Sequence, residues 1–171
     1  FHLKEVPWEK NGFYYDDKAC KPSKHPYYFA GLYYIQEPSA MLVGELASPK
    51  PGMRVLDLCA APGGKTSHLA GMMKGQGILV ANEIVPNRAK ILSQNVERMG
   101  IRNCIVTCEN PDRLADVFAG FFDLIVVDTP CSGEGMFRRD EIARNEWSPS
   151  NVDMCADRSR DILAAADRMF R

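Results

Sequence analysis

Two loops in this sequence carry residues that could do chemistry. The first, Asp57-Leu-Cys-Ala-Ala-Pro-Gly-Gly-Lys-Thr66, is rich in small residues, and the second, Val126-Val-Asp-Thr-Pro-Cys-Ser-Gly-Glu-Gly135, holds an acid and a thiol. Each follows an apolar run typical of a buried parallel strand, Met53–Leu58 or Leu124–Asp128. Ligands collect beyond the carboxyl ends of such strands. The first loop therefore predicts a cradle for a nucleotide-like ligand, and the thiol in the second predicts covalent chemistry on a substrate.

The composition is that of an ordinary soluble globular protein. A length of 171 residues predicts one domain with a substantial core, and 46% of the residues are hydrophobic and 25% charged. The net charge of −1 gives no overall support to nucleic-acid binding. No apolar stretch is long enough to span a membrane, and no signal-peptide pattern is present. We therefore expect a cytoplasmic protein without a membrane partner.

The cysteines do not form paired CxxC motifs, which favours reduced thiols over a disulfide framework. Cys104 and Cys108 have no further sulfur or histidine ligands nearby in the sequence, so we expect no metal site. The six cysteines are Cys20, Cys59, Cys104, Cys108, Cys131 and Cys155.

The chain divides into two parts. Residues 1–50 are aromatic and rich in turn formers, with a helical pattern from Glu37 to Ser48-Pro49, and we expect this segment to pack on the core. In residues 51–171 strands and helices alternate, which predicts βαβ units and a Rossmann-like α/β fold, a parallel sheet with helices on both faces. The predicted strands are Met53–Leu58, Gly77–Asn82, Cys104–Thr107 and Phe122–Asp128. The predicted helices are Lys65–Met73, Pro86–Met99 and one capped by Ser148.

The last predicted helix is amphipathic and is expected to turn one set of apolar residues to the core. A helix after a parallel strand normally delivers another strand. The sequence offers nothing to pair beside the fourth strand, so we expect a fragment, or the ordered part of a longer protein, truncated after this helix. The apolar set is Val152, Cys155, Ile162, Leu163, Ala166, Met169 and Phe170.

The first loop can be compared with two phosphate-binding motifs. It lacks the G-x-G-x-x-G spacing of a dinucleotide site. The window Cys59–Thr66 matches a Walker A loop except that cysteine replaces the first glycine, and Pro62 removes a backbone donor. A P-loop-like nucleotide hydrolase is therefore one alternative function, and an inactive module that binds cofactor or docks RNA is another.

Glu83 favours a nucleoside ligand without phosphates. It follows the second predicted strand about 20 residues after the glycine pair, where an acid in a Rossmann-like sheet meets ribose hydroxyls. The alternative is that Glu83 only caps the next helix. With the two loops, the pattern fits S-adenosylmethionine better than ATP or NAD.

Four segments together resemble the Nop/Sun family of RNA (cytosine-5) methyltransferases, and within it the bacterial RsmF-like ribosomal RNA enzymes. The resemblance covers nearly the whole chain, and the two loop motifs occur in the family's order. The segments are Gly31-Leu-Tyr-Tyr-Ile-Gln-Glu-Pro-Ser-Ala-Met41, Leu58-Cys-Ala-Ala-Pro-Gly-Gly-Lys-Thr66, Ala81-Asn-Glu-Ile84 and Asp128-Thr-Pro-Cys-Ser-Gly-Glu-Gly-Met-Phe137.

The resemblance implies a class I methyltransferase core that uses S-adenosylmethionine to methylate RNA, with ribosomal RNA as the expected partner. It implies that Glu83 holds the ribose, that Arg88 lies nearby and that Asp128 lies between cofactor and base. Asn110 stands where the family usually has an aspartate beside the adenine. The residues expected to wrap the cofactor are Cys59, Ala60, Ala61, Pro62, Gly63, Gly64 and Lys65.

A thiol is needed because carbon 5 of cytosine is too weak a nucleophile to take a methyl group unaided. Addition of a thiolate at carbon 6 activates carbon 5, and elimination later releases the thiol. From the residues alone Cys131 would be the nucleophile, and Asp128 would stabilise the developing charge. The family instead assigns the attack to a second cysteine, expected beyond Arg171, with Cys131 assisting elimination. We therefore expect these residues alone to bind the cofactor without turnover.

RNA contacts are expected from two places. The lysine-bearing aromatic segment 13–34 could stack on bases and neutralise phosphates, or it could be a packed subdomain that covers the sheet. Arg138 and Arg139 could touch phosphate, or they could be solvated surface residues.

Overall fold

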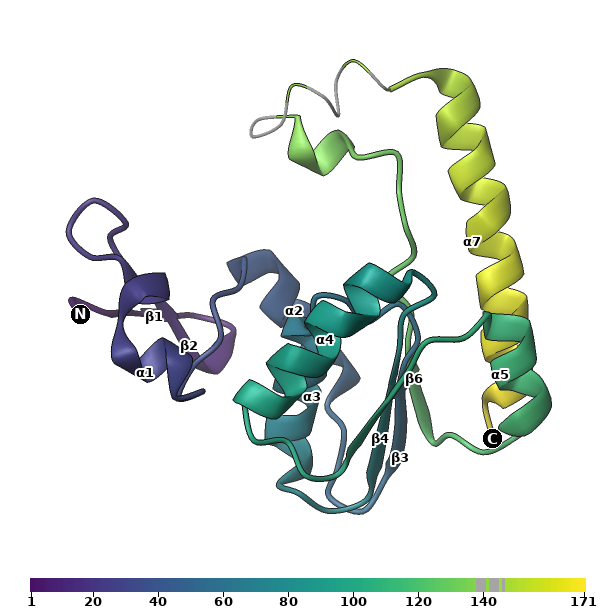
Figure 1. The fold of residues 1–171 in the computed structure, drawn as a ribbon, viewed down its shortest axis with the longest axis horizontal. Coiled ribbons are helices and arrows are strands. Elements are labelled where there is room, and N and C mark those ends of the chain that lie inside the picture. The colour runs from purple at the N-terminus through teal and green to yellow at the C-terminus, as the bar shows by residue number, and fades with distance from the viewer. Residues whose placement is uncertain (138–140, 142–144, 146) are drawn as a thin grey trace.

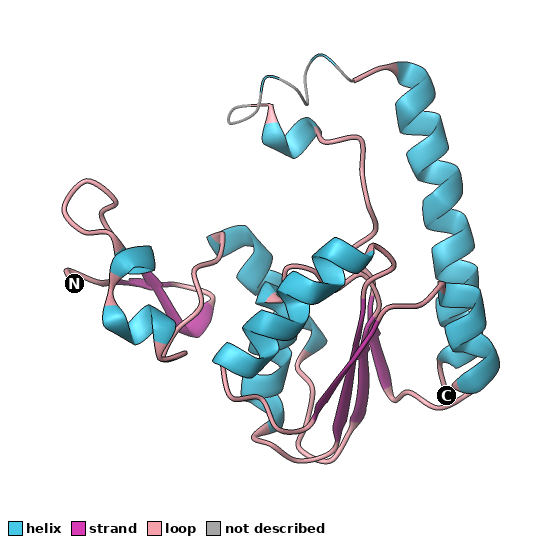
Figure 2. Ribbon diagram, in the orientation of Figure 1, coloured by secondary structure: helices cyan, strands magenta, loops and turns pink. Residues whose placement is uncertain are grey.

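The core is a four-stranded parallel sheet in the order β5-β4-β3-β6 (Figures 1 and 2). The computed structural model describes residues 1–137, 141, 145 and 147–171. Leu56 lies opposite Val80 on one side and Ile125 on the other. Because all four strands run the same way, their carboxyl ends meet at one edge. The strands are β3 (Arg54–Asp57), β4 (Ile78–Asn82), β5 (Cys104–Thr107) and β6 (Leu124–Val126).

Helices cover both faces of this sheet, as predicted (Figure 2). The side chains of neighbouring strand residues point to opposite faces, so Leu56 packs with α5 and α7, whereas Val55 packs with α3. Ala81 packs against α4. These helices are α3 (Gly64–Met73), α4 (Pro86–Arg98), α5 (Pro111–Val117) and α7 (Pro149–Met169). Among the residues that the structure describes, no helix has the length and apolar character needed to cross a bilayer.

The N-terminal part begins with an antiparallel hairpin that the sequence did not predict. Its other described elements are short, apart from α2, which ends as predicted before Ser48. Arg98 of α4 joins this part to the core, because its Nη1 donates to the carbonyl oxygen of Tyr28 at 2.7 Å and its guanidinium lies over the Tyr28 ring. The division at residue 50 stays a prediction. The elements are β1 (Lys4–Val6), β2 (Glu9–Tyr14), η1 (Pro22–Lys24), α1 (Pro26–Phe29) and α2 (Pro38–Ala47).

Gly31 shows why the contact with α4 can be so close. It has a φ of +73°, and a Cβ there would lie 1.9 Å from the carbonyl oxygen of Arg98. A side chain would therefore be strained and would also collide with the end of α4.

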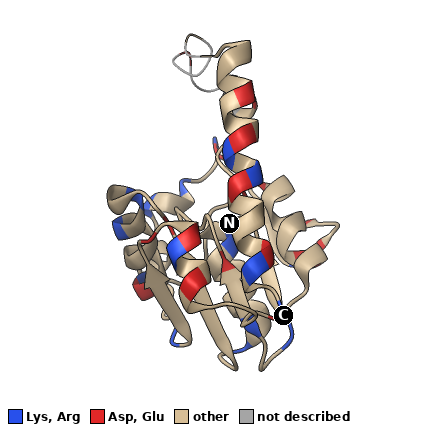
Figure 3. Ribbon diagram, turned by 90° about the vertical axis from the view of Figure 1, so that its right-hand side faces the viewer, with Lys and Arg blue, Asp and Glu red and all other residues tan. Residues whose placement is uncertain are grey.

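The second half of the chain differs in detail from the sequence predictions. The fourth strand is only Leu124–Val126, and the short helix α5 and the 3-10 turn η2 (Glu134–Met136) were missed. In α7, Leu163 is 53% exposed, and beyond the helix Phe170 is 54% exposed, so neither belongs to the core. Phe170 follows the last helical residue, Met169, and its backbone is extended. Figure 3 shows charged residues of both signs along α7.

The expectation that nothing pairs beside the fourth strand was also wrong. After α7, Phe170 forms a parallel bridge with Phe122, and the backbone N–H of Arg171 donates to the carbonyl oxygen of Phe122 at 3.0 Å. The helix therefore returns the chain to the sheet, next to the segment that leads into β6.

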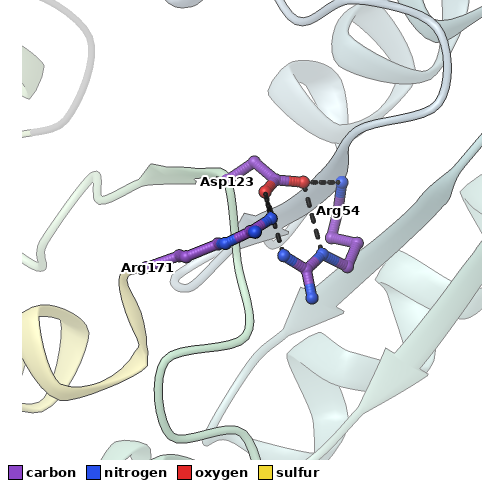
Figure 4. Close-up of polar contacts among 3 residues, drawn as sticks. All are labelled: Arg54, Asp123 and Arg171. Atoms are coloured by element: carbon purple, nitrogen blue, oxygen red, sulfur yellow. Dashed lines mark hydrogen bonds and ion pairs between the residues drawn. The ribbon is translucent and has the colours of Figure 1, made fainter.

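Asp123 links this return to β3 (Figure 4). Its carboxylate accepts hydrogen bonds from the Arg54 backbone N–H at 2.9 Å and from Arg54 Nη2 at 3.0 Å. Arg171 Nη1 donates to the same carboxylate at 3.5 Å. The Arg54 hydrogen bonds hold the pKa of Asp123 well below its usual range.

We expect acid to weaken the fold through this carboxylate. Its pKa is depressed in the folded state, so the stabilisation is present above the unfolded pKa of about 3.9 and is lost as the pH falls further. Asp123→Asn should lower the melting temperature at pH 7 and flatten its decline in acid, measured by circular dichroism. Asp17→Asn, at an exposed turn, is the control. Equal acid dependence in Asp123→Asn and the unmodified protein would contradict this role.

Candidate functional site

A cavity of about 670 Å³ opens at the carboxyl edge of the sheet. Its walls come from the segments that follow β3, β4, β5 and β6, and from α7. This is the edge where ligands bind in open α/β sheets. The predicted site residues that line it are Cys59, Ala61, Glu83, Arg88, Asn110, Asp128 and Cys131.

The loop after β3 is held against α4 by hydrogen bonds to its own backbone. Arg88 Nη2 donates to the carbonyl oxygen of Ala61 at 2.9 Å, and Asn95 Nδ2 donates to that of Pro62 at 2.8 Å. The N–H of Ala60 donates to the carbonyl oxygen of Asn82 at 2.9 Å, which ties the loop to the end of β4. The loop is therefore a fixed wall of the cavity.

Five predicted cradle residues lie outside the described lining of the cavity. Gly63 has a φ of +109° and forms the tight turn into α3, with Leu92 of α4 beside it. A Cβ on Gly64 would lie 3.0 Å from the Tyr34 ring, so this glycine faces the N-terminal part. Gly63 and Gly64 therefore set the backbone conformation of the loop and pack against α4 and the N-terminal part. The five are Ala60, Pro62, Gly63, Gly64 and Lys65.

Glu83 is the buried acid of the cavity, with only 3% of its surface exposed. Its Oε1 accepts a hydrogen bond from the Val85 N–H at 3.0 Å, and its Oε2 lies 3.3 Å from Arg88 Nη1. The carboxylate thus orients the start of α4 while lining the cavity. The two alternatives weighed from the sequence, ribose contact and helix capping, are compatible in this geometry.

Asn110 stands at the start of α5. Its Oδ1 accepts a hydrogen bond from the Asp112 N–H at 2.8 Å, so the side chain caps the helix while lining the cavity. Ile84, Pro111 and Ile162 also line the cavity and give it apolar surface. The cavity therefore suits a flat, partly apolar group such as a nucleobase.

Asp128 and Cys131 line the cavity from the loop after β6. Lys65 Nζ donates to Asp128 Oδ2 at 2.6 Å, and the Asp128 side chain is 59% exposed. The Cys131 thiol is exposed on the same loop. The Ser159 hydroxyl of α7 donates to Thr129 Oγ1 at 2.9 Å and so anchors the loop. An accessible acid and thiol therefore stand together at the mouth.

The other cysteine of the cavity is suited to binding rather than attack. Burial raises the pKa of the Cys59 thiol to about 11, so it stays protonated near neutral pH.

Asp57, at the end of β3, is a fully buried acid. Burial raises its pKa to about 6, although the Thr66 hydroxyl donates to its Oδ2 at 2.7 Å. Asp57 Oδ1 is buried and has no hydrogen-bond partner among the described residues.

Sequence reasoning missed three charged residues of the cavity, Asp112 of α5 and Arg158 and Asp161 of α7. Asn110-Pro111 is a helix-start signal that could have revealed α5. Nothing in the sequence places α7 over the loops. Arg138 and Arg139, considered for phosphate contact, lie outside the described residues.

Two family models match this chain. One, described as 16S rRNA methyltransferase RsmB/F, matches residues 45–171. The other, described as the N-terminal domain of 16S rRNA methyltransferase RsmF, matches residues 1–38.

Curated relatives carry the name ribosomal RNA small subunit methyltransferase F. The protein from Serratia proteamaculans is 38% identical over 97% of this chain and 36% of its own length. The protein from Vibrio parahaemolyticus is 41% identical over 96% of this chain and 35% of its own length. The chain thus spans about a third of these relatives.

Solved structures share the whole fold. A methyltransferase homologue from Pyrococcus horikoshii is 32% identical, with a TM-score of 0.85 over 100% of this chain and 53% of its own. NSun6 from Pyrococcus horikoshii, solved with SFG, is 25% identical, with a TM-score of 0.79 over 89% of this chain and 38% of its own. The core is therefore a Rossmann-like methyltransferase fold, as predicted.

Proposed function

This chain belongs to the 16S rRNA methyltransferase RsmB/F family, and we propose that it forms the cofactor-binding core of an enzyme that methylates carbon 5 of a cytosine in ribosomal RNA. The observation that carries the proposal is one cavity with Glu83 in one wall and Asp128 and Cys131 in another. Methyl transfer requires the nucleoside cofactor and the target base to lie next to each other, and this cavity has residues suited to each. The free cysteines and an RNA substrate favour a cytoplasmic location.

The residues present fit S-adenosylmethionine. Glu83 is buried beside the cavity and, as a carboxylate, can accept hydrogen bonds from two ribose hydroxyls. Ile84 and Pro111 offer apolar surface to the adenine, and Asn110 offers an amide to its edge. When bound, the cofactor supplies an electrophilic methyl group at a sulfonium centre.

The chain's own groups would act on the base at the cavity mouth. The cytosine must leave its stack to reach Asp128 and Cys131. Asp128 would accept a hydrogen bond from the exocyclic amine or the protonated ring nitrogen, stabilising charge that develops when a thiolate adds to carbon 6. Following the family resemblance, the attacking cysteine lies beyond Arg171, and Cys131 assists the later elimination. Elimination requires removal of the proton from carbon 5 as the attacking thiol leaves. The exposed position of Cys131 suits a role in that proton transfer.

A covalent-trapping experiment separates the two roles of Cys131. We expect Cys131→Ala in the full protein to accumulate a protein–RNA adduct that survives denaturation, because addition proceeds while elimination is blocked. The measurement is a denaturing gel after incubation with substrate RNA and S-adenosylmethionine. Cys108→Ala, which changes an exposed thiol outside the cavity lining, should leave no adduct. Loss of both adduct and turnover in Cys131→Ala would instead make Cys131 the attacking thiol.

A further inference from the structure

Three ionisable side chains converge on the far side of the loop after β3, away from the methylation cavity. Glu9 comes from β2, Glu45 from α2 and His68 from α3. One ligand atom from each lies within 4.8 Å of the others. His68 Nε2 is 2.6 Å from Glu9 Oε2 and 3.9 Å from Glu45 Oε1. We call these three residues the Glu-Glu-His cluster.

The centre of the cluster is buried and incompletely bonded. Glu9 is only 5% exposed, and the Asn11 N–H donates to its Oε1 at 2.7 Å. That hydrogen bond fixes one carboxylate oxygen and leaves Oε2 directed at His68. Both Glu9 Oε2 and His68 Nε2 are buried without a hydrogen-bond partner among the described residues, although they are close enough for an ion pair. A buried carboxylate in this condition needs a counter-charge.

Two glycines make room for the cluster. A Cβ on Gly44 of α2 would lie 2.3 Å from His68 Nδ1. A Cβ on Gly12 would lie 2.6 Å from Glu9 Cγ. The backbone therefore approaches both side chains so closely that their positions depend on the absence of a Cβ there.

We propose that the Glu-Glu-His cluster binds one divalent transition-metal ion of the Zn²⁺ type, with water completing the coordination. An imidazole nitrogen with carboxylate oxygens suits Zn²⁺, whereas Mg²⁺ and Ca²⁺ prefer oxygen ligands alone. The charge of the ion balances the two carboxylates. Bonds of about 2.0–2.2 Å place tetrahedral ligand atoms about 3.3–3.6 Å apart, so Glu9 Oε2 and His68 Nε2 must separate by about 1 Å to admit the ion.

The site would tie the N-terminal hairpin to the methyltransferase core. Glu9 lies in the hairpin, and His68 lies one turn beyond Lys65 on the helix that leaves the cofactor loop. The site could not be predicted from sequence spacing, because its ligands come from three separate elements.

Calorimetry with Zn²⁺ on the metal-free full protein tests the proposal. We expect binding that His68→Gln weakens by about 100-fold or more, whereas His2→Gln, at an exposed histidine, leaves it unchanged. Glu45→Gln is the second variant and should also weaken Zn²⁺ binding. Because the Glu45 side chain is partly exposed, this change should disturb the fold less than a change at the buried Glu9. Circular dichroism of each variant without metal separates lost binding from lost fold.

Co²⁺ absorption identifies the ligands. A visible d–d spectrum without the near-ultraviolet band of thiolate ligands supports the cluster. No Zn²⁺ binding by the unmodified protein, equal affinity in His68→Gln, or a thiolate spectrum would overturn the proposal. These outcomes leave the methylation function untouched, because none of the three residues is in the described lining of its cavity.

Discussion

Asp128→Asn is expected to lower the rate constant of methyl transfer in the full protein by about 100- to 1,000-fold. The carboxylate stands at the cavity mouth with Lys65 Nζ on its Oδ2 at 2.6 Å, which orients it and leaves the other oxygen for the base. A neutral amide cannot offer the same negative charge to a base that becomes protonated as the thiolate adds. The measurement is single-turnover methylation of substrate RNA with labelled S-adenosylmethionine.

The control for this prediction is Asp153→Asn, an exposed change on α7 outside the described cavity lining. It should retain the full rate. Cofactor affinity in Asp128→Asn should stay within about threefold of the unmodified protein, a change of less than about 1 kcal/mol. An unchanged methylation rate, or a loss explained entirely by weaker cofactor binding, would contradict the assignment of Asp128 to the base.

Glu83→Ala is expected to weaken S-adenosylmethionine binding by about 10- to 100-fold. Hydrogen bonds to a charged group contribute about 1.5–3 kcal/mol, and water entering the enlarged pocket replaces part of that. The buried position of Glu83, which is only 3% exposed in the cavity lining, makes the loss large. Calorimetric titration with S-adenosylmethionine measures the change.

Glu83 also accepts the Val85 N–H at the start of α4, so a fold defect must be separated from a ligand defect. Glu83→Gln keeps an acceptor oxygen for that N–H and should fold normally while binding more weakly than the unmodified protein. Glu97→Ala, an exposed position on α4, serves as the control for loss of an acid from this helix. Full affinity in a folded Glu83→Ala protein would leave Glu83 with a capping role only.

The sequence predicted the sheet well because β4 (ILVAN) is a nearly continuous apolar run, the pattern of a strand buried on both faces, and β3 (RVLD) carries the buried pair Val55-Leu56 between its charged ends. It did not predict the N-terminal hairpin, because β2 (EKNGFY) mixes polar and apolar residues without regular alternation. The helix α5 is short, and its start signal at Asn110-Pro111 competes with an ordinary turn.

The sequence likewise predicted some residues of the candidate site and missed others. Glu83, Asp128 and Cys131 were found because each follows a strand, and parallel strands end at one edge of a sheet. The wall formed by Arg158 and Asp161 could not be foreseen, because it depends on where α7 packs over the loops. Gly63 and Gly64 stay predicted cofactor contacts, although neither is in the described lining of the cavity; a Cβ on Gly63 would lie beside Leu92 and one on Gly64 beside Tyr34.

The most direct measurement of the central idea is a pair of calorimetric titrations of the unmodified protein, one with S-adenosylmethionine and one with ATP. A cavity with a buried carboxylate that can accept hydrogen bonds from ribose hydroxyls, beside a loop whose proline removes a phosphate donor, should bind S-adenosylmethionine at least about tenfold more tightly, a difference of about 1.4 kcal/mol. Tighter binding of ATP would contradict the proposal that this cavity binds S-adenosylmethionine and would support a phosphate-binding loop instead.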